Sequence, residues 1–182
     1  SRQYPVPTYV VEFLLGRYCA STDPEEIEEG LAIVEKQLQG RTVRTGDEEL
    51  FKSKAREKGS VKIIDIVRTR LDAKNDCYVA ELPSLALKDV QIGDALVREN
   101  ERMLTDGFYA EVVLEYDPVI AQEKNGRPFL ISGLRPIQMS NPNVLSVLAK
   151  GRHKFTTEEW LNFLLRSVGY EPDSLDNRAK MV

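Results

Sequence analysis

The chain contains the stretch Val61-Lys-Ile-Ile-Asp-Ile-Val-Arg-Thr-Arg-Leu-Asp-Ala-Lys-Asn-Asp-Cys-Tyr-Val-Ala-Glu-Leu82, in which apolar and polar side chains alternate. A period of two is typical of a β-strand with one buried face. The expected inward residues are Val61, Ile63, Val67 and Leu71, and the expected outward residues are Lys62, Arg68 and Arg70. Residues 73–76 favour a turn into a second strand over residues 77–82. The stretch therefore predicts a β-hairpin with a cationic outer face.

A second pair of strands is expected after Gly107. Five alternating residues would share one face, namely Phe108, Ala110, Val112, Leu114 and Tyr116, and a loop containing Asn125-Gly126 leads to a strand around residues 129–131. Residues 94–104, between the two hairpins, indicate a short helix. The order of elements fits either a small barrel of the oligonucleotide-binding (OB) type or an open sheet capped by a helix. We expect an α+β fold in which residues 60–139 form an OB-like β-barrel with an inserted helix.

The first 59 residues predict a helical subdomain. Helices are expected over residues 9–18, 22–40 and 47–58, the second beginning at Thr22-Asp23-Pro24 and the third ending at Gly59. The second helix carries an apolar stripe of Ile27, Leu31, Val34 and Leu38, which we expect to be buried. The third has only Leu50, Phe51 and Ala55 to bury.

The C-terminal part contains a helix whose two ends are both specified by the sequence, over residues 155–169. Thr156 and Glu159 have the spacing of a capping box, and Gly169 favours the left-handed conformation that ends a helix. Trp160, Leu164 and Val168 form an apolar stripe that needs a docking surface. The prolines between residues 136 and 142 indicate a boundary. We therefore expect residues 140–182 to be a helical connector toward a further module, with this chain the front part of something larger.

The charge of the chain is unevenly distributed. The formal net charge is −4, yet residues 41–74 carry ten basic and six acidic side chains. Residues 1–40 carry three basic and seven acidic side chains, and residues 75–147 carry six and eleven. A basic middle thus lies between acidic neighbours. Hydrophobic residues make up 42% of the chain, and the sequence contains neither a secretion signal nor an apolar run long enough for a membrane span. We expect a soluble cytoplasmic protein.

The common catalytic and cofactor motifs are missing from the sequence. His153 is the single histidine, and Cys19 and Cys77 have no CxxC partner, so a zinc site and a disulfide are both disfavoured. No glycine is followed by lysine, which argues against a nucleotide phosphate loop. We expect no enzymatic activity and no cofactor in this chain.

Basic residues are the best candidates for a binding role. Lys62, Arg68 and Arg70 share the outer strand face, and Lys74 lies in the adjoining turn. Further candidates are Lys124 and Arg127, which flank Asn125-Gly126, and Arg152 and Lys154, which precede the capped helix and could equally mark a hinge. Such an array is suited to following a phosphate backbone without reading bases. The alternative is a solvent-facing strand surface that protects a sheet edge.

Several stretches, in order along the chain, resemble the N-terminal region of the BrxL family. They are Val6-Pro-Thr-Tyr-Val-Val-Glu-Phe-Leu-Leu-Gly-Arg-Tyr-Cys-Ala20 leading into Glu25-Glu-Ile-Glu-Glu-Gly-Leu31, Ser53-Lys-Ala-Arg-Glu-Lys-Gly59 with Lys62-Ile-Ile-Asp65, Leu134-Arg-Pro-Ile-Gln-Met139, and Phe155-Thr-Thr-Glu-Glu-Trp160 continuing through Leu164-Leu-Arg-Ser-Val-Gly-Tyr-Glu-Pro-Asp173. The family comprises Lon-like AAA+ proteins of BREX phage-defence systems. The resemblance covers nearly the whole chain.

The resemblance implies a place in a larger machine. In the family this region precedes an AAA+ ATPase module and a Lon-protease-like domain, and the assembly is similar to replicative helicases of the MCM type. The implied partners are DNA, further copies in a ring, and other BREX components. We therefore expect a non-catalytic DNA-binding and ring-assembly domain with little sequence specificity. The alternative is a protein-interaction or oligomerisation module that does not contact DNA, and the acidic residues 1–40 and 75–147 favour it.

Overall fold

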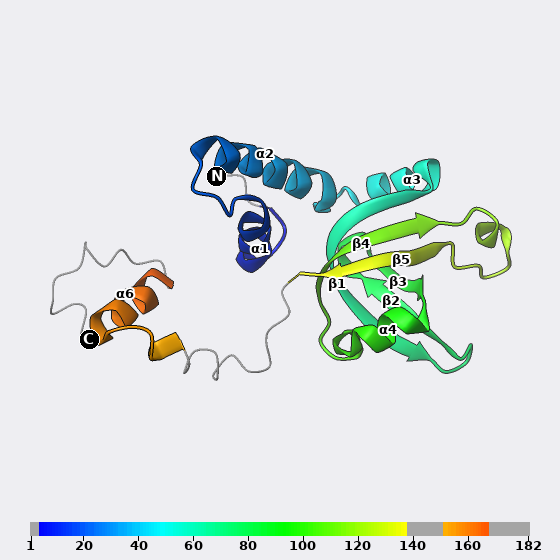
Figure 1. Cartoon of the computed structure of the whole chain (residues 1–182). Helices are drawn as coiled ribbons and strands as arrows, with labels where there is room; N and C mark the ends of the chain where they lie inside the picture. Colours follow the sequence, from blue (N-terminus) through cyan, green and yellow to red (C-terminus); the bar gives the residue numbers. More distant parts are fainter. Residues whose placement is uncertain (1–3, 138–150, 168–182) are drawn as a thin grey trace. The chain divides into compact units, whose positions relative to one another are not determined.

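The computed structural model describes residues 4–137 and 151–167 (Figure 1). Two compact units make up the chain, Ser1–Met139 and Ser140–Val182, and each is described by itself. The first unit combines three N-terminal helices with a β-barrel that carries a further short helix, so the chain has the expected α+β fold. In the described ranges, every helix is too short or too polar to cross a bilayer.

The three N-terminal helices are α1 (Thr8–Tyr18), α2 (Pro24–Arg41) and α3 (Glu48–Lys58). Asp23 caps α2, because its side chain accepts a hydrogen bond from the backbone N–H of Glu25 at 3.0 Å. Gly59 ends α3 in the left-handed conformation, with φ of 79°. Both boundary predictions are confirmed.

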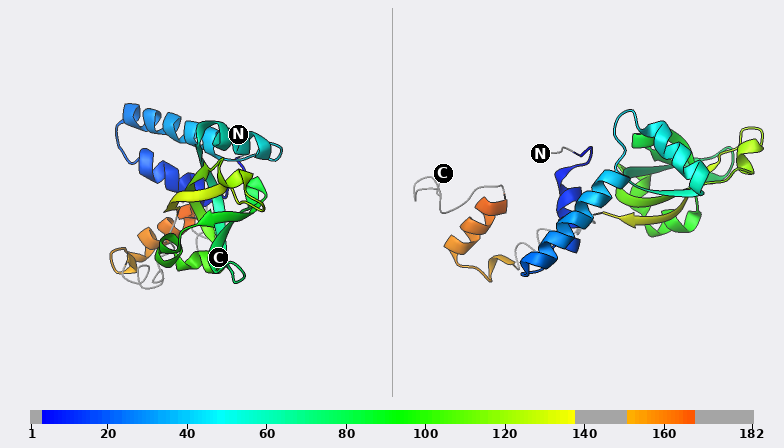
Figure 2. Two further views of the ribbon diagram at one scale, coloured as in Figure 1. Left: turned by 90° about the vertical axis from the view of Figure 1, so that its right-hand side faces the viewer. Right: turned by 90° about the horizontal axis from the view of Figure 1, so that it is seen from above.

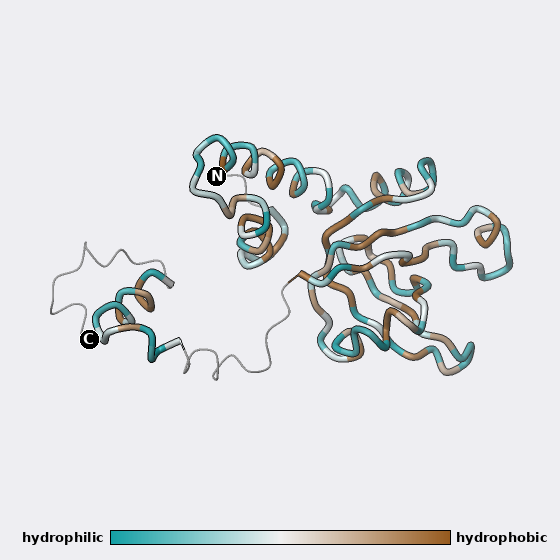
Figure 3. Tube along the Cα trace, in the orientation of Figure 1, coloured by the Kyte–Doolittle hydropathy of each residue, from teal (hydrophilic) through white to brown (hydrophobic). Residues whose placement is uncertain are grey.

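Helices α1 and α2 pack against each other and against the outside of the barrel. Their shared cluster contains Val10, Leu14, Val34 and Leu38 together with Ile64 and Ile137. Hydrophobic positions occur along both helices (Figure 3). Gly30 permits the close approach, because a Cβ atom there would collide with the backbone carbonyl of Tyr18. The prediction that Leu31 is buried is wrong, since 49% of its surface is exposed. The buried face of α2 passes through Gly30 instead of its bulkier neighbour.

The barrel has five strands: β1 (Ser60–Asp72), β2 (Cys77–Leu82), β3 (Leu87–Ile92), β4 (Phe108–Tyr116) and β5 (Phe129–Pro136). They close in the order β1-β2-β3-β5-β4, with every pair antiparallel except β3 and β5. Helix α4 (Asp94–Glu99) and the 3-10 turn η2 (Glu101–Leu104) connect β3 to β4. The predicted OB-like barrel with an inserted helix is confirmed, and the open-sheet alternative is excluded.

Three details of the barrel and its covering helix differ from the prediction. Strand β3 was not predicted, because it is short and buries only Val90 and Ile92 fully. Leu71 is 56% exposed, since it lies one residue from the tip of the β1–β2 hairpin, beyond the barrel core. Leu50 of α3 is also exposed, while Phe51 from the same helix enters the core.

A buried carboxylate, that of Asp65, joins β1 to the short turn η1 (Pro83–Leu85). Its Oδ1 accepts from the Ile66 N–H at 2.8 Å, and its Oδ2 accepts from the Ser84 N–H at 3.0 Å and Oγ at 2.7 Å. Burial raises the pKa of Asp65 above its reference value of 3.8, although the three hydrogen bonds oppose the shift. These hydrogen bonds fix the turn that follows β2 against the middle of β1.

One carboxylate on β4 anchors both packing helices to the barrel. Glu111 Oε2 accepts from Arg17 of α1 and Oε1 accepts from Arg41 of α2, each at 2.9 Å. The three side chains are mostly buried, with exposures of 14% for Glu111, 18% for Arg17 and 27% for Arg41. Removing one partner of a pair this shielded from water is costly, because it leaves a mostly buried charge without compensation.

The second unit contains α6 (Thr157–Ser167). Its predicted capping box is confirmed: Thr156 Oγ1 accepts from the Glu159 N–H at 3.2 Å, and Glu159 Oε2 accepts from the Thr156 N–H at 2.8 Å. Trp160 is half-buried, with its ring centroid 5.8 Å from that of Phe155 and 5.4 Å from that of Phe163. Val168 and Gly169 lie outside the described residues, so the docking of the full stripe stays a prediction.

Candidate nucleic-acid interface

Two loops meet beside β2 and β3 and form a cleft on one side of the barrel. They are the β1–β2 turn, residues 73–76, and the β4–β5 connection, residues 117–128, which includes the 3-10 turn η3 (Ile120–Gln122). The space between them measures about 780 Å³ and is lined mainly by polar groups. We call it the barrel cleft. OB-folds bind oligonucleotides on the face of strands 2 and 3. The loop between strands 1 and 2 and the loop between strands 4 and 5 border this binding site.

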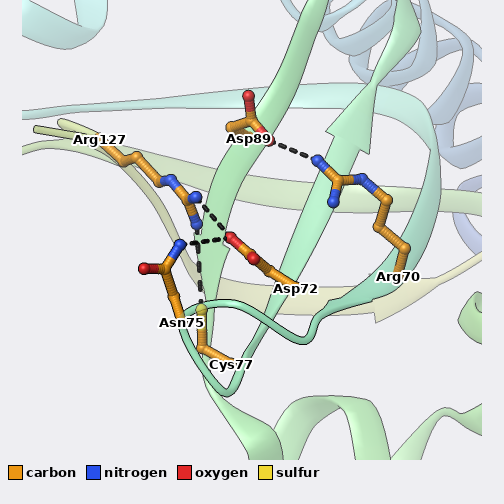
Figure 4. A network of polar contacts seen from close by, with 6 residues as sticks. All are labelled: Arg70, Asp72, Asn75, Cys77, Asp89 and Arg127. Carbon is orange, nitrogen blue, oxygen red and sulfur yellow. Dashed lines mark hydrogen bonds and ion pairs between the residues drawn. The ribbon is translucent and has the colours of Figure 1, made fainter. Parts of the chain in front are cut away.

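An ion pair fastens the two loops together. Arg127 Nη2 donates to Asp72 Oδ2 at 2.5 Å, and Asn75 Nδ2 donates to the same oxygen at 2.8 Å (Figure 4). Arg127 Nη1 also lies 3.9 Å from the Cys77 sulfur, and the Arg127 carbonyl accepts a bond from Gln91. The Arg127 side chain is thus held inside the protein's own network and forms one wall of the cleft.

Loop conformation adds to this fixed geometry. Asn125 adopts a left-handed conformation with φ of 63°. A Cβ atom on the next residue, Gly126, would collide with the Ile120 carbonyl. In the predicted Asn-Gly turn, asparagine tolerates the left-handed conformation at position 125, and the close contact at position 126 requires glycine. It places Lys124 and Arg127 on either side of a tight loop tip.

Four of the predicted cations line the barrel cleft: Arg70, Lys74, Lys124 and Arg127. Arg70 forms an ion pair with Asp89 at 2.6 Å, and both side chains are about half exposed. Such a pair is weak and exchanges readily with another anion. Lys74 and Lys124 are exposed and make no ion pair within residues 4–137. They are the available cations of the cleft.

The other four predicted cations lie elsewhere. Lys62 lines hollows between the helices and the barrel, and Arg68 Nε donates to the Asp106 carbonyl at 3.0 Å. The outer face of β1 is divided because residues 60–67 pair with β4 whereas residues 68–72 pair with β2. In the second unit, Arg152 donates to the Phe155 carbonyl and to Thr157 Oγ1. Lys154 lies in the turn before α6.

A protein-family model matches more than half of the chain, all of it within the first unit. Residues 1–116 match the model described as BREX system Lon protease-like protein BrxL N-terminal. The chain belongs to the BrxL family. Residues 129–182 match a second model, described as Lon-like protease BrxL-like, ATPase domain. The ATPase-domain match of this BrxL sequence thus begins at β5, inside the barrel.

Two curated relatives are each named Lon-like protease BrxL. The BrxL of Escherichia coli O9:H4 (strain HS) is 40% identical over 175 residues, and that of Bacillus cereus (strain H3081.97) is 38% identical over 176 residues. Each alignment covers 96% of this chain and 25% or 26% of the relative. The chain therefore spans about a quarter of the length of these BrxL proteins.

The acidic partners of the cleft were not predicted from the sequence. Asp72 and Asp89 neutralise two of the four cations, which makes the cleft less positive than the basic residues alone suggest. The sequence does place Asp72 directly before the β1–β2 turn. Its contact with Arg127 depends on the fold. Asp89 lies on β3, the strand that was not predicted, so its position opposite Arg70 required the fold.

The ion pair of Asp72 predicts an acid-dependent loss of stability. Hydrogen bonds from Asn75 and Arg127 lower its pKa from 3.8 to about 2. The stabilisation is therefore complete above pH 3.8 and is lost as the pH falls through about 2. We expect Asp72→Asn to be less stable than wild type at neutral pH, with the difference shrinking over this acidic window.

Urea denaturation across the acidic range tests this prediction. Asp106→Asn serves as the matched control, because Asp106 is exposed and its side chain makes no ion pair within residues 4–137. The control should follow the wild-type pH dependence. A constant difference between wild type and Asp72→Asn down to pH 2 would contradict the prediction.

Proposed function

We propose that this chain is a non-catalytic, DNA-contacting and ring-assembly part of a Lon-like BREX protein, acting in the cytoplasm and carrying no cofactor of its own. The single observation that supports it best is the barrel cleft, which lies on the face that OB-folds use and has two available lysines at its rims. Residues 129–182 match an ATPase-domain model but contain no glycine followed by lysine, so we assign ATP hydrolysis to residues outside this stretch.

The proposed binding mode is contact with phosphates. Lys74 and Lys124 stand on the two loops that border the cleft, so a strand crossing it would pass between them. Arg70 would exchange its exposed Asp89 partner for a phosphate at little cost. Among the residues that the structure describes, Tyr78 is the one aromatic side chain lining the cleft, so stacking on successive bases is limited. Little sequence specificity is expected.

Assembly into a ring would strengthen these modest contacts. Each copy offers few cations, and linking several copies on one DNA raises the effective concentration of every further contact. Other BREX components are additional proposed partners. The alternative, a protein-interaction module, draws support from the partial neutralisation of the cleft by Asp72 and Asp89.

A salt-titrated binding assay distinguishes the two functions. We expect Lys74→Gln with Lys124→Gln in the full-length protein to weaken duplex DNA binding roughly tenfold and to flatten the salt slope by about two units. Arg70 and Arg127 are left intact, because their ion pairs would confound the result. Fluorescence anisotropy with a labelled duplex of arbitrary sequence gives both quantities.

The control variant carries Arg44→Gln with Arg56→Gln. Both arginines are exposed and lie outside the cleft, and the change in net charge is the same. The control should bind nearly as wild type does. Absence of salt-dependent DNA binding by the wild-type protein would refute the proposed function and favour the interaction module.

A further inference from the structure

A second cationic surface lies between the helices and the barrel, away from the barrel cleft. It consists of two adjoining hollows of about 350 and 580 Å³, both lined by Arg41 and Lys62. Helices α2 and α3 lie on the same side of the barrel, and β1 follows α3 directly (Figures 1 and 2). We call this surface the helix–barrel groove.

Positive charge dominates the groove. Seven cationic side chains from five elements line it, and they are Arg17, Lys36, Arg41, Lys54, Lys58, Lys62 and Arg135. Within the described residues, Glu111 is the one carboxylate in the lining, and both of its oxygens are occupied by Arg17 and Arg41. The groove therefore has a larger excess of positive charge than the barrel cleft.

Most of these cations are available to a ligand. Lys36, Lys58, Lys62 and Arg135 are exposed and make no ion pair or side-chain hydrogen bond within residues 4–137. Lys54 lies over the Phe51 ring, 4.9 Å from its centroid, which orients its ammonium without neutralising it. Lys54 and Lys58 are four residues apart on α3 and so share one helix face.

The chemistry of the lining favours an extended polyanion. Lysines occupy most of the open positions, and lysine contacts phosphate as a point charge without a fixed bidentate geometry. Acidic peptide motifs are usually bound by clusters of arginines, but Arg17 and Arg41 in this lining are already paired with Glu111. Within the described residues, Ile33 is the one large apolar side chain of this lining that is exposed. A nucleic-acid backbone fits all three features.

We propose that the helix–barrel groove binds the phosphates of a nucleic-acid strand, as a second track beside the barrel cleft. The proposal rests on the proposed DNA contact and assigns to it a surface formed jointly by α1, α2, α3, β1 and β5. Arg41 and Lys62 occupy the junction of the two hollows, and Glu111 holds Arg41 in place. The groove is therefore a built surface whose shape depends on the docking of the helices.

Neutralising three groove lysines tests the proposal. In the full-length protein, Lys36→Gln, Lys58→Gln and Lys62→Gln together should flatten the salt slope of duplex binding by roughly two to three units and weaken affinity at least tenfold. The three side chains are exposed and make no specific bonds, so folding should be retained, which circular dichroism verifies. The matched control is Arg44→Gln, Arg56→Gln and Arg98→Gln, three exposed residues outside the groove with the same change in charge.

The outcomes separate this inference from the proposed function. If wild type binds DNA and the groove variant keeps its affinity and slope, the groove proposal is wrong while the DNA-contacting function stands. If the groove variant and the charge-matched control weaken equally, general electrostatic attraction explains binding, and the groove proposal is again wrong. If wild type does not bind, the proposed function fails first.

Lysine footprinting provides a readout that needs no substitution. Acetylation of the wild-type protein with and without duplex DNA, followed by mass spectrometry, should show protection of Lys36, Lys58 and Lys62. Lys88 is exposed and lies outside the groove, beside the loop that borders the barrel cleft, so it reports contact at the cleft separately. Unchanged acetylation of Lys36, Lys58 and Lys62 on addition of DNA would overturn the proposal.

Discussion

Replacing Asp65 by alanine is expected to lower the free energy of unfolding by about 3 kcal/mol, because buried donors lose their acceptor. The Ile66 and Ser84 backbone N–H groups and the Ser84 hydroxyl all donate to this carboxylate. Removing a buried charge recovers part of the desolvation cost, but the unpaired donors outweigh it. Urea denaturation of Asp65→Ala measures the loss, and Asp106→Ala, at an exposed position, should change little.

The pH dependence of Asp65 has the opposite sign to that of Asp72. Because burial raises the pKa of Asp65, the folded state binds a proton more tightly than the unfolded chain. Its contribution to stability is therefore greatest below pH 3.8 and declines as the pH rises through the raised pKa. Asp65→Asn should lack this decline while keeping a similar side-chain volume. An identical decline in the variant would contradict the assignment to Asp65.

Loss of the Glu111 side chain should have the next largest effect. Glu111→Ala leaves Arg17 and Arg41 mostly buried without a counter-charge, and we expect stability to fall by about 2 kcal/mol. This is below the cost of breaking a fully buried pair, because water still reaches both arginines. Chemical denaturation measures the change.

Two further variants make the Glu111 prediction specific. Glu115, on the same strand, is partly exposed and makes no ion pair within residues 4–137. Glu115→Ala should therefore leave the free energy of unfolding nearly unchanged. Glu111→Gln keeps an acceptor oxygen and should recover part of the loss. Equal stability of Glu111→Ala and Glu115→Ala would show that the helices do not depend on this anchor.

Local chemistry made the helix boundaries predictable. Asp23, Gly59 and the Thr156–Glu159 capping box act within a few residues, so their effect is readable from the sequence. Strand β3 could not be found in the same way, because its pairing with β2 and β5 is set by the closed barrel. The exposure of Leu31 was likewise hidden, since it depends on how closely α1 crosses α2 at Gly30.

The candidate site was predictable in part for the same reason. Loop and turn patterns located Lys74 and Lys124, which the fold brings to one cleft. Arg70 pairs with Asp89 because the strand order brings β3 near β1. Lys62 lies apart from Arg70 because β1 pairs first with β4 and then with β2. The groove cations come from five elements, so no single stretch of sequence displays them together.

The position of β5 has a consequence for synthesis on the ribosome. The N-terminal family match ends at residue 116, yet β5, over residues 129–136, pairs with both β3 and β4. Until it emerges, the nascent chain has four strands with two unpaired edges, a state that is prone to association. Closure of the barrel must therefore wait for the first residues that match the ATPase-domain model. Translation order thus makes completion of the first unit dependent on residues that match the ATPase-domain model.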